Sequence, residues 1–141
     1  MVEIPIHYLP GAPKLEINER GDWIDLYVYQ DTLLNVNDYT YVSLGVSMAL
    51  PEGYEAIVAP RSSTFKRWGL LQTNSIGVID NSYRGTDDIW MMPVVATRSV
   101  TIPKGTRLCQ FRIQEKQPEI TFIPQDRLND VNRGGLGSSG A

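Results

Sequence analysis

One segment of the chain gathers positive charge and hydroxyl groups. Pro60-Arg61-Ser62-Ser63-Thr64-Phe65-Lys66-Arg67 holds three cations and three hydroxyls in a turn-prone stretch. An arginine fork beside serine hydroxyls can bind phosphate oxygens in more than one geometry. The plain alternative is a solvated loop, which is the commoner case for a bare Arg-Ser-Ser. The segment makes phosphate binding a hypothesis that other parts of the chain must support.

A second segment places an acid at the end of an apolar run, just before a turn. The run Gly77-Val78-Ile79-Asp80 leads into Asn81-Ser82 and Arg84-Gly85. A carboxylate held there could act as a general base if a water molecule reaches it. An aspartate in a turn more often caps its own backbone, so this segment alone does not decide between the two roles.

The C-terminal segment, residues 132–141, has almost nothing to bury and is rich in glycine and serine. It is therefore expected to be mobile in isolation. One interpretation is a frayed tail. The other is an arm whose glycine amides and serine hydroxyls wrap a phosphate, with Arg133 adding charge.

The elements that must position these segments are mostly strands. Runs rich in β-branched and aromatic residues are separated by Pro and Gly, which is typical of an all-β sandwich or barrel. Only residues 63–71 are predicted to hold a short helix. The expected strands cover residues 23–29, 39–46, 54–59, 89–96, 98–102, 107–113 and 120–123.

Length and charge narrow the function further. The 141 residues suit one domain, and the net charge of −3 argues against non-specific binding to nucleic acid. A small anionic ligand stays open, because a divalent cation can supply local positive charge. Nothing approaches the roughly 18 apolar residues of a membrane span, and the N-terminus lacks signal-peptide features. A cytoplasmic protein is expected, with the single cysteine, Cys109, buried as a small apolar residue.

The order and spacing of these pieces resemble the trimeric dUTPase family, over about residues 21–140. That family carries five motifs, and each has a counterpart here in the same order and with nearly the usual spacing. The matching segments are Asp25-Leu26, Pro60 to Ser63, Gly77 to Gly85, Gly105 to Gln110 and Arg133 to Gly140.

The resemblance implies a pyrophosphatase that hydrolyses dUTP to dUMP and pyrophosphate, which keeps uracil out of DNA and supplies dUMP for dTMP synthesis. Asp80 would take a proton from the water that attacks the α-phosphorus. Tyr83 would lie against the deoxyribose and exclude a 2′-hydroxyl, and Asn74 would contact uracil. The backbone of Gly77 and Val78-Ile79 would pair with the base.

The resemblance implies that other motifs bind the phosphates and the metal. Asp25 would hold Mg²⁺ through coordinated waters, which suits a cation that keeps several waters and takes further oxygens from substrate phosphates. The phosphate-contacting positions would be Arg61, Ser62, Ser63 and Gln110. The substrate-binding positions of the arm would be Arg133, Gly135, Leu136, Gly137, Ser138 and Ser139.

The family fold is a jelly-roll-like β-clip that assembles as a homotrimer with shared active sites. In that pattern residues 1–125 would form the β-clip domain and residues 126–141 a flexible glycine-rich arm carrying the fifth motif. The first, second and fourth motifs would come from one subunit, the third from another and the fifth from a third. Neither nucleic acid nor membrane is expected as a partner.

The chain departs from the family pattern at three places. Ser82 replaces the second acid of the third motif, and Arg133 lies two residues closer to Leu136 than usual. Leu136 also stands where the family has a phenylalanine over uracil, so the lid could be Leu136, Trp90 or Met91. These features are similar to a bacterial and prophage branch of the family.

Three alternatives stay open. A dCTP deaminase shares the fold, but its proton-shuttling glutamate would fall ten residues after Asp80, where this chain has Trp90. A phage-type regulatory role, in which the protein binds a repressor, could coexist with catalysis. A structural trimer with a dead site is the third, and the presence of Asp80, Tyr83, Arg61, Ser62 and Gln110 argues against it.

Overall fold

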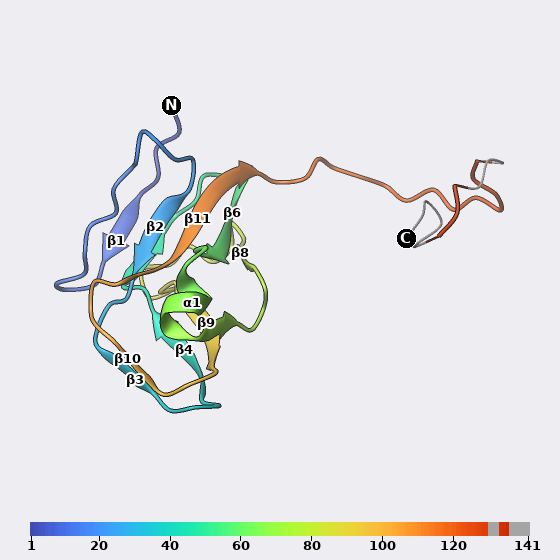
Figure 1. Cartoon of the computed structure of the whole chain (residues 1–141). Helices are drawn as coiled ribbons and strands as arrows, with labels where there is room; N and C mark the ends of the chain where they lie inside the picture. Colours follow the sequence, from blue (N-terminus) through green and yellow to red (C-terminus); the bar gives the residue numbers. More distant parts are fainter. Residues whose placement is uncertain (130–132, 136–141) are drawn as a thin grey trace.

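Twelve short elements make up the computed structural model, which describes residues 1–129 and 133–135. Figure 1 shows one small helix in front of the strands, and a tail that leaves the body after the last strand. In chain order they are β1 (Ile6–Tyr8), β2 (Ile24–Tyr27), β3 (Thr32–Leu34), β4 (Tyr39–Ser43), β5 (Val46–Met48), β6 (Tyr54–Pro60), α1 (Thr64–Trp68), β7 (Leu70–Gln72), β8 (Gly77–Ile79), β9 (Met91–Ala96), β10 (Val100–Ile102) and β11 (Arg107–Glu115).

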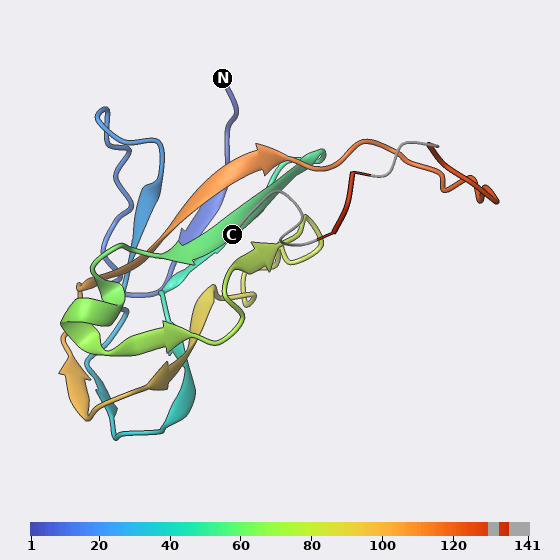
Figure 2. The same ribbon diagram turned by 45° about the vertical axis from the view of Figure 1, so that its right-hand side comes forward.

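Two antiparallel sheets form the body. One has the order β2-β11-β6-β8 and the other β4-β9-β7, while β1-β5 and β10-β3 form two-stranded ribbons. Figure 2 shows the layer with β6 and β11 lying over the layer with β4, β7 and β9. The all-β sandwich expected from the sequence is confirmed.

The core lies between these two sheets because alternate residues of each strand face inward. Ala56 and Val58 of β6 are buried on one side, and Met92 and Val94 of β9 on the other. Trp90 bridges the layers, with its ring 5.2 Å from that of Phe111 in an edge contact. Burial of these apolar side chains is the main force that holds the two sheets together.

Glycine ends the strand expected at residues 39–46 early. Residues 39–46 divide into β4 and β5 at Gly45, whose φ is +72°. A Cβ there would lie 2.8 Å from the Tyr29 ring, so both the conformation and the space require glycine.

Strand β11 is the hub of the larger sheet, since it pairs with both β2 and β6. Its register shifts between Arg107 and Cys109, and this bulge lets the consecutive residues Leu108 and Cys109 both be buried. The expected burial of Cys109 is therefore confirmed.

The prediction of a strand at residues 120–123 is wrong. This segment forms no strand, and Ile120, Phe122 and Ile123 are all exposed. It lies in the tail that leaves the body after β11 (Figure 1), so it has no sheet edge to join. In the described part of the chain, no helix is long and apolar enough to cross a membrane.

Candidate functional site

A groove of about 470 Å³ opens between the end of β8 and the outer face of β4 and β9. Val58 and Gln72, both buried, lie at its floor. The structure brings together here the residues expected to contact the base, the sugar and the attacking water. The lining residues are Tyr41, Val58, Gln72, Asn74, Gly77, Val78, Ile79, Asp80, Ser82, Tyr83, Ile89, Met91 and Pro93.

The wall of the groove formed by β8 offers backbone hydrogen-bonding groups. Strand β8 lies at the edge of its sheet and pairs only with β6, so its outer backbone groups have no strand partner among the described residues. A Cβ added at Gly77 would lie 3.6 Å from Asn74 Nδ2, in the corner of the groove. Glycine there leaves room for a flat ligand beside the strand edge.

Asn74 is held in one orientation by a buried glutamine. Gln72 donates from Nε2 to Asn74 Oδ1 at 2.9 Å and to the Val58 carbonyl at 3.2 Å. Because Oδ1 of Asn74 is engaged, its Nδ2 group is the one left to donate to a ligand.

Asp80 follows β8 directly and carries its carboxylate at the solvent side of the groove. The carboxylate accepts hydrogen bonds from the Ser82 hydroxyl and, at 2.6 Å, from the Ser82 backbone N–H. These two bonds stabilise the charged form and lower the pKa of Asp80 below its usual value. The group is therefore ionised at neutral pH, as a proton acceptor must be.

Tyr83 is fixed at the rim by its phenol. Its hydroxyl donates to the Ile89 carbonyl at 2.9 Å, and its backbone N–H donates to the Asp80 carbonyl at 3.1 Å. Burial and the nearby Asp88 raise the pKa of the phenol, so it stays protonated and neutral. The ring is consequently held close to Asp80.

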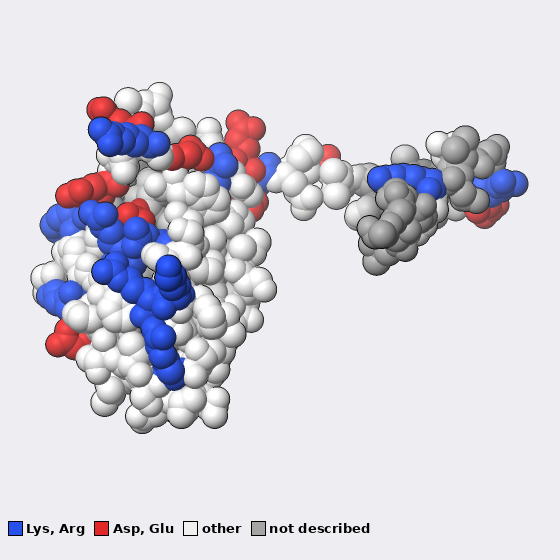
Figure 3. Space-filling model, in the orientation of Figure 1, with Lys and Arg blue, Asp and Glu red and all other residues white. Residues whose placement is uncertain are grey.

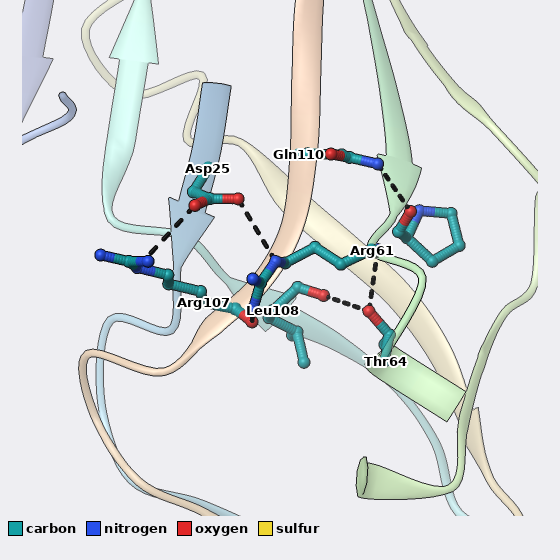
Figure 4. A network of polar contacts seen from close by, with 7 residues as sticks. Asp25, Arg61, Thr64, Arg107, Leu108 and Gln110 are labelled. Atoms are coloured by element: carbon teal, nitrogen blue, oxygen red, sulfur yellow. Dashed lines mark hydrogen bonds and ion pairs between the residues drawn. The ribbon is translucent and has the colours of Figure 1, made fainter. Parts of the chain in front are cut away.

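A second polar cluster lies on the other end of the larger sheet (Figure 4). Asp25 in β2 pairs with Arg61 Nε at 3.3 Å and with Arg107 Nε at 3.8 Å. Gln110, next to Asp25 across the β2-β11 pair, donates from Nε2 to the Pro60 carbonyl at 3.2 Å. Three of the expected phosphate and metal residues are thus brought together.

A buried threonine holds the Arg61 loop against β11. Thr64 Oγ1 accepts the Arg61 backbone N–H at 2.8 Å and donates to the Leu108 carbonyl at 2.8 Å. Arg61 also donates from Nη1 to the Arg107 carbonyl at 3.2 Å. Ser62 is exposed beside this loop, and Ser63 makes no side-chain capping bond to α1, so its hydroxyl is not used by the helix.

The face around this cluster is basic although the chain as a whole is acidic. Figure 3 shows Lys and Arg side chains gathered in a band on the face that carries α1. Lys66 and Arg67 lie in the last turn of the helix, and Arg98 donates to both of their carbonyls. Concentrated positive charge of this kind attracts a polyanion despite the net charge of −3.

Asp25 also fits a water-mediated divalent cation. Its side chain is 29% exposed and supplies hard oxygen atoms, the ligand type that Mg²⁺ prefers. Among the described residues no group of three or more His, Cys, Asp or Glu side chains could enclose a metal ion. Because two arginines already share the charge of Asp25, further oxygens would have to come from water and from phosphate.

The two clusters are far apart within one chain. Across the sheet, Asp25 in β2 lies level with Ala59 in β6, whereas Asp80 follows Ile79, which lies level with Ala56. Four residues along the strands and three strand spacings therefore separate the two carboxylates, roughly 20 Å. One chain does not place both of them on the same phosphorus atom.

The expected arm is only partly described. Arg133 and Gly135 are exposed and line neither the groove nor the second cluster. The other predicted arm residues, Leu136, Gly137, Ser138 and Ser139, lie outside the described residues.

The prediction that Trp90 could form the lid over uracil is wrong. Its side chain is 1% exposed and packs in the core against Phe111, because the segment before β9 turns it inward. Met91, the next residue, points the other way, is 44% exposed and lines the groove.

Several residues of the two clusters were not expected from the sequence. They position other side chains or line the groove. Ser82, Thr64 and Arg107 lie within segments that the sequence had singled out, whereas Tyr41 and Gln72 lie outside those segments. The residues are Tyr41, Thr64, Gln72, Ser82 and Arg107.

Comparison with known proteins defines the class that this fold and these clusters belong to. The model of the dUTPase family matches residues 22–140, and the chain belongs to that family.

Individual relatives make the likeness more specific. The SPbeta prophage-derived deoxyuridine 5′-triphosphate nucleotidohydrolase of Bacillus subtilis strain 168 is 49% identical over 140 residues, which is 99% of both chains. The deoxyuridine 5′-triphosphate nucleotidohydrolase of Thermobifida fusca is 34% identical, over 93% of this chain and 74% of its own length.

The solved structures confirm the fold. The dUTPase of Staphylococcus bacteriophage 80alpha with dUpNHpp, from work on phage dUTPases that control transfer of virulence genes, superposes with a TM-score of 0.80 at 19% identity and 99% coverage of both chains. The dUTPase of Streptococcus mutans gives 0.73 at 19% identity, over 82% of this chain and 98% of its own. The expected jelly-roll-like β-clip is therefore confirmed.

Proposed function

We propose that the chain hydrolyses dUTP to dUMP and pyrophosphate. The observation that carries this proposal is the ionised Asp80 carboxylate beside Tyr83 and Asn74 in one groove. It is supported by 49% identity to a prophage-derived deoxyuridine 5′-triphosphate nucleotidohydrolase.

The groove binds the nucleoside. Uracil pairs along the open edge of β8, at Gly77, Val78 and Ile79, and receives a hydrogen bond from Nδ2 of Asn74, whose other amide atom is engaged by Gln72. Cytosine presents a donor where uracil presents an acceptor, so it would leave buried polar groups unpaired. The Tyr83 ring, fixed through its hydroxyl, packs on the deoxyribose and leaves no room for a 2′-hydroxyl.

Asp80 activates the attacking water. The carboxylate accepts a proton from water as the water oxygen forms a bond to the α-phosphorus, and the bond from that phosphorus to the bridging oxygen breaks to release pyrophosphate. The hydrogen bonds from Ser82 keep Asp80 ionised and aim its second oxygen outward.

The cluster of Asp25, Arg61 and Gln110, with the hydroxyls of Ser62 and Ser63, binds the phosphate chain. Asp25 would hold Mg²⁺ through water, and the ion would offset charge on the leaving pyrophosphate. Since Asp25 is already paired with two arginines, metal and substrate are expected to bind together rather than in sequence.

The separation of the two clusters supports a homotrimer with shared sites. Asp80 of one subunit and Asp25 of another would complete one active site, which the roughly 20 Å between them in a single chain does not allow. The arm, residues 126–141, would close over that site, with Leu136 over uracil and with Arg133, Gly135 and Gly137 to Ser139 on the phosphates.

Pyrophosphate release tests the proposal. The purified chain is incubated with dUTP, UTP, dTTP and dCTP, with and without Mg²⁺, beside Asp80→Asn. We expect Mg²⁺-dependent release from dUTP alone, reduced about 10²- to 10⁴-fold in the variant because a positioned base contributes that much. Ammonia release from dCTP, or no release from dUTP, would contradict it.

Likeness to prophage and phage proteins also supports an additional regulatory role, in which the chain binds a repressor. If the repressor occupies the nucleotide groove, dUTP must compete with it. A pull-down from cells that contain the repressor, with and without dUTP, tests this competition. Recovery of no repressor, or no effect of dUTP, would count against a role at this groove.

A further inference from the structure

Tyr41 is a groove residue with no role in the proposed chemistry. It lies in β4, opposite Pro93 of β9, and lines the same groove as Asn74, Asp80 and Tyr83. Its side chain is 60% exposed, which is unusual for a large ring in the middle of a strand. An exposed ring beside a binding groove indicates a ligand contact.

The groove has one polar wall and one apolar wall. The polar wall is the open edge of β8 with the Asn74 amide, and the apolar wall is Tyr41, Met91 and Pro93. A pyrimidine has the matching shape, because it is a flat ring with hydrogen-bonding groups on its edge and apolar faces. If its edge pairs with β8, a face is left for the opposite wall.

Tyr41 is the aromatic residue of that apolar wall. Among the described lining residues only Tyr41 and Tyr83 carry aromatic rings, and the Tyr83 hydroxyl donates to the Ile89 carbonyl near Asp80. The Tyr41 hydroxyl shares a 3.1 Å hydrogen bond with that of Tyr39, and the two rings meet edge to face at 5.6 Å. The hydrogen bond with Tyr39 raises the pKa of the Tyr41 phenol, so the wall is uncharged.

We propose that Tyr41 is a base-positioning residue whose ring packs against the nucleobase, while β8 and Asn74 pair with its edge. This inference rests on the proposed function and extends it to a residue outside the five motifs. The ring holds the base in the groove and does not reach the α-phosphorus, so it acts on binding rather than on the chemical step.

The matched control is Tyr39. It has the same residue type, is 57% exposed, lies on the same face of β4 two residues away, and does not line the groove. Tyr41→Val removes the ring from the groove, Tyr41→Phe keeps the ring without the hydroxyl, and Tyr39→Val removes an equivalent ring outside the groove.

The experiment measures kcat and KM for dUTP, the Kd of dUMP by calorimetry, and the sedimentation coefficient for all four proteins. We expect Tyr41→Val to raise KM and Kd about 3- to 10-fold, the size of one aromatic contact. Its kcat should stay within about 2-fold. Tyr41→Phe and Tyr39→Val should match the wild type, and all four should sediment alike.

Unchanged KM and Kd in Tyr41→Val, with a wild type that turns over dUTP, would overturn this inference alone. Equal increases in Tyr39→Val and Tyr41→Val, or a smaller sedimentation coefficient for Tyr41→Val, would also overturn it, because the rings would then support assembly. A wild type that neither hydrolyses dUTP nor binds dUMP would overturn both the inference and the proposed function.

Discussion

Ser82 controls the charge of the carboxylate that the proposed reaction needs. Its hydroxyl and its backbone N–H both donate to Asp80 and lower the pKa of that group. A group with a lowered pKa stays ionised as the pH falls, so activity should persist into acid and be lost only when Asp80 is protonated.

We expect Ser82→Ala to move the acid limb of the kcat/KM profile to higher pH, because removing the hydroxyl lets the pKa of Asp80 rise. Activity well above that limb should change little. The measurement is kcat/KM for dUTP across the acid range, with Ser82→Thr, which keeps a hydroxyl, as the control. An acid limb at the same pH in all three proteins would show that the hydroxyl does not govern this ionisation.

A second prediction for a single residue concerns Asp25. Asp25→Asn keeps the shape of the side chain and removes the charge that would attract a hydrated Mg²⁺. We expect the Mg²⁺ concentration for half-maximal activity to rise about 10-fold or more, the usual cost of losing an outer-shell partner of a metal. Stability should change by no more than about 1 kcal/mol, because the ion pairs of Asp25 are partly exposed.

The chain supplies a control for this variant. Asp22 pairs with Arg112 at 3.3 Å, near the start of the same strand, and its side chain is 68% exposed. Asp22→Asn should leave the Mg²⁺ dependence unchanged. An equal shift in both variants would mean that general surface charge, rather than Asp25, sets the dependence.

Among the elements, the loop before α1 is held against β11 by a buried hydroxyl. Thr64 is 2% exposed, and it joins the Arg61 backbone to the carbonyl of Leu108 in the bulged part of β11. The bulge disturbs the strand pairing locally and leaves this carbonyl free to accept from a side chain.

We expect Thr64→Val, which has nearly the same shape, to lower the free energy of unfolding by about 2–3 kcal/mol. The change leaves a part-buried N–H and a buried carbonyl without partners. Urea unfolding at a fixed protein concentration measures the effect, since assembly would otherwise alter it. Thr64→Ser keeps the hydroxyl and should lose less; equal losses in both variants would assign the effect to packing instead.

The sequence predicted the elements whose own residues favour a strand or a helix. Strands β2, β4, β6, β9, β10 and β11 fall within or overlap the expected runs, and α1 falls within residues 63–71. The strands β1, β3, β7 and β8 were missed because each has only three residues and is defined by its partner in space. Residues 120–123 mislead for the opposite reason, since β-branched and aromatic residues favour strands only where a sheet edge can accept them.

The same limit applies to the candidate site. Asn74, Asp80 and Tyr83 were found because they lie in one short motif-bearing hairpin, and the structure places them in one groove. Tyr41 was missed because it reaches the groove from a strand outside the motifs. Arg107 lies within the fourth motif, but its role was missed because it depends on the pairing of β11 with β2. Only the sheet register brings such residues beside the motifs.

At the scale of the whole molecule, the separated clusters predict complementation between inactive variants. If sites are shared, Arg61→Ala and Asp80→Asn each inactivate a different half of a site. Mixing equal amounts, unfolding and refolding together should restore up to about a quarter of wild-type activity, because random trimers contain that share of sites with both intact residues. Simple mixing without refolding should restore less.

The readout is dUTP turnover of the co-refolded mixture, compared with each variant refolded alone. A control mixture of Asp80→Asn with Asp80→Ala should stay inactive, because no site can then receive an intact Asp80. A co-refolded mixture no more active than its components would contradict shared sites.

The burial of Cys109 has a consequence for following the motions of this protein. It is the only cysteine in the chain, it lies fully buried in the hub strand β11, and burial raises the pKa of its thiol. A thiol reagent modifies the thiolate of an accessible cysteine, so modification requires β11 to separate from its neighbours. The rate at which this sulfur is labelled therefore measures how often β11 separates from its neighbours in the larger sheet.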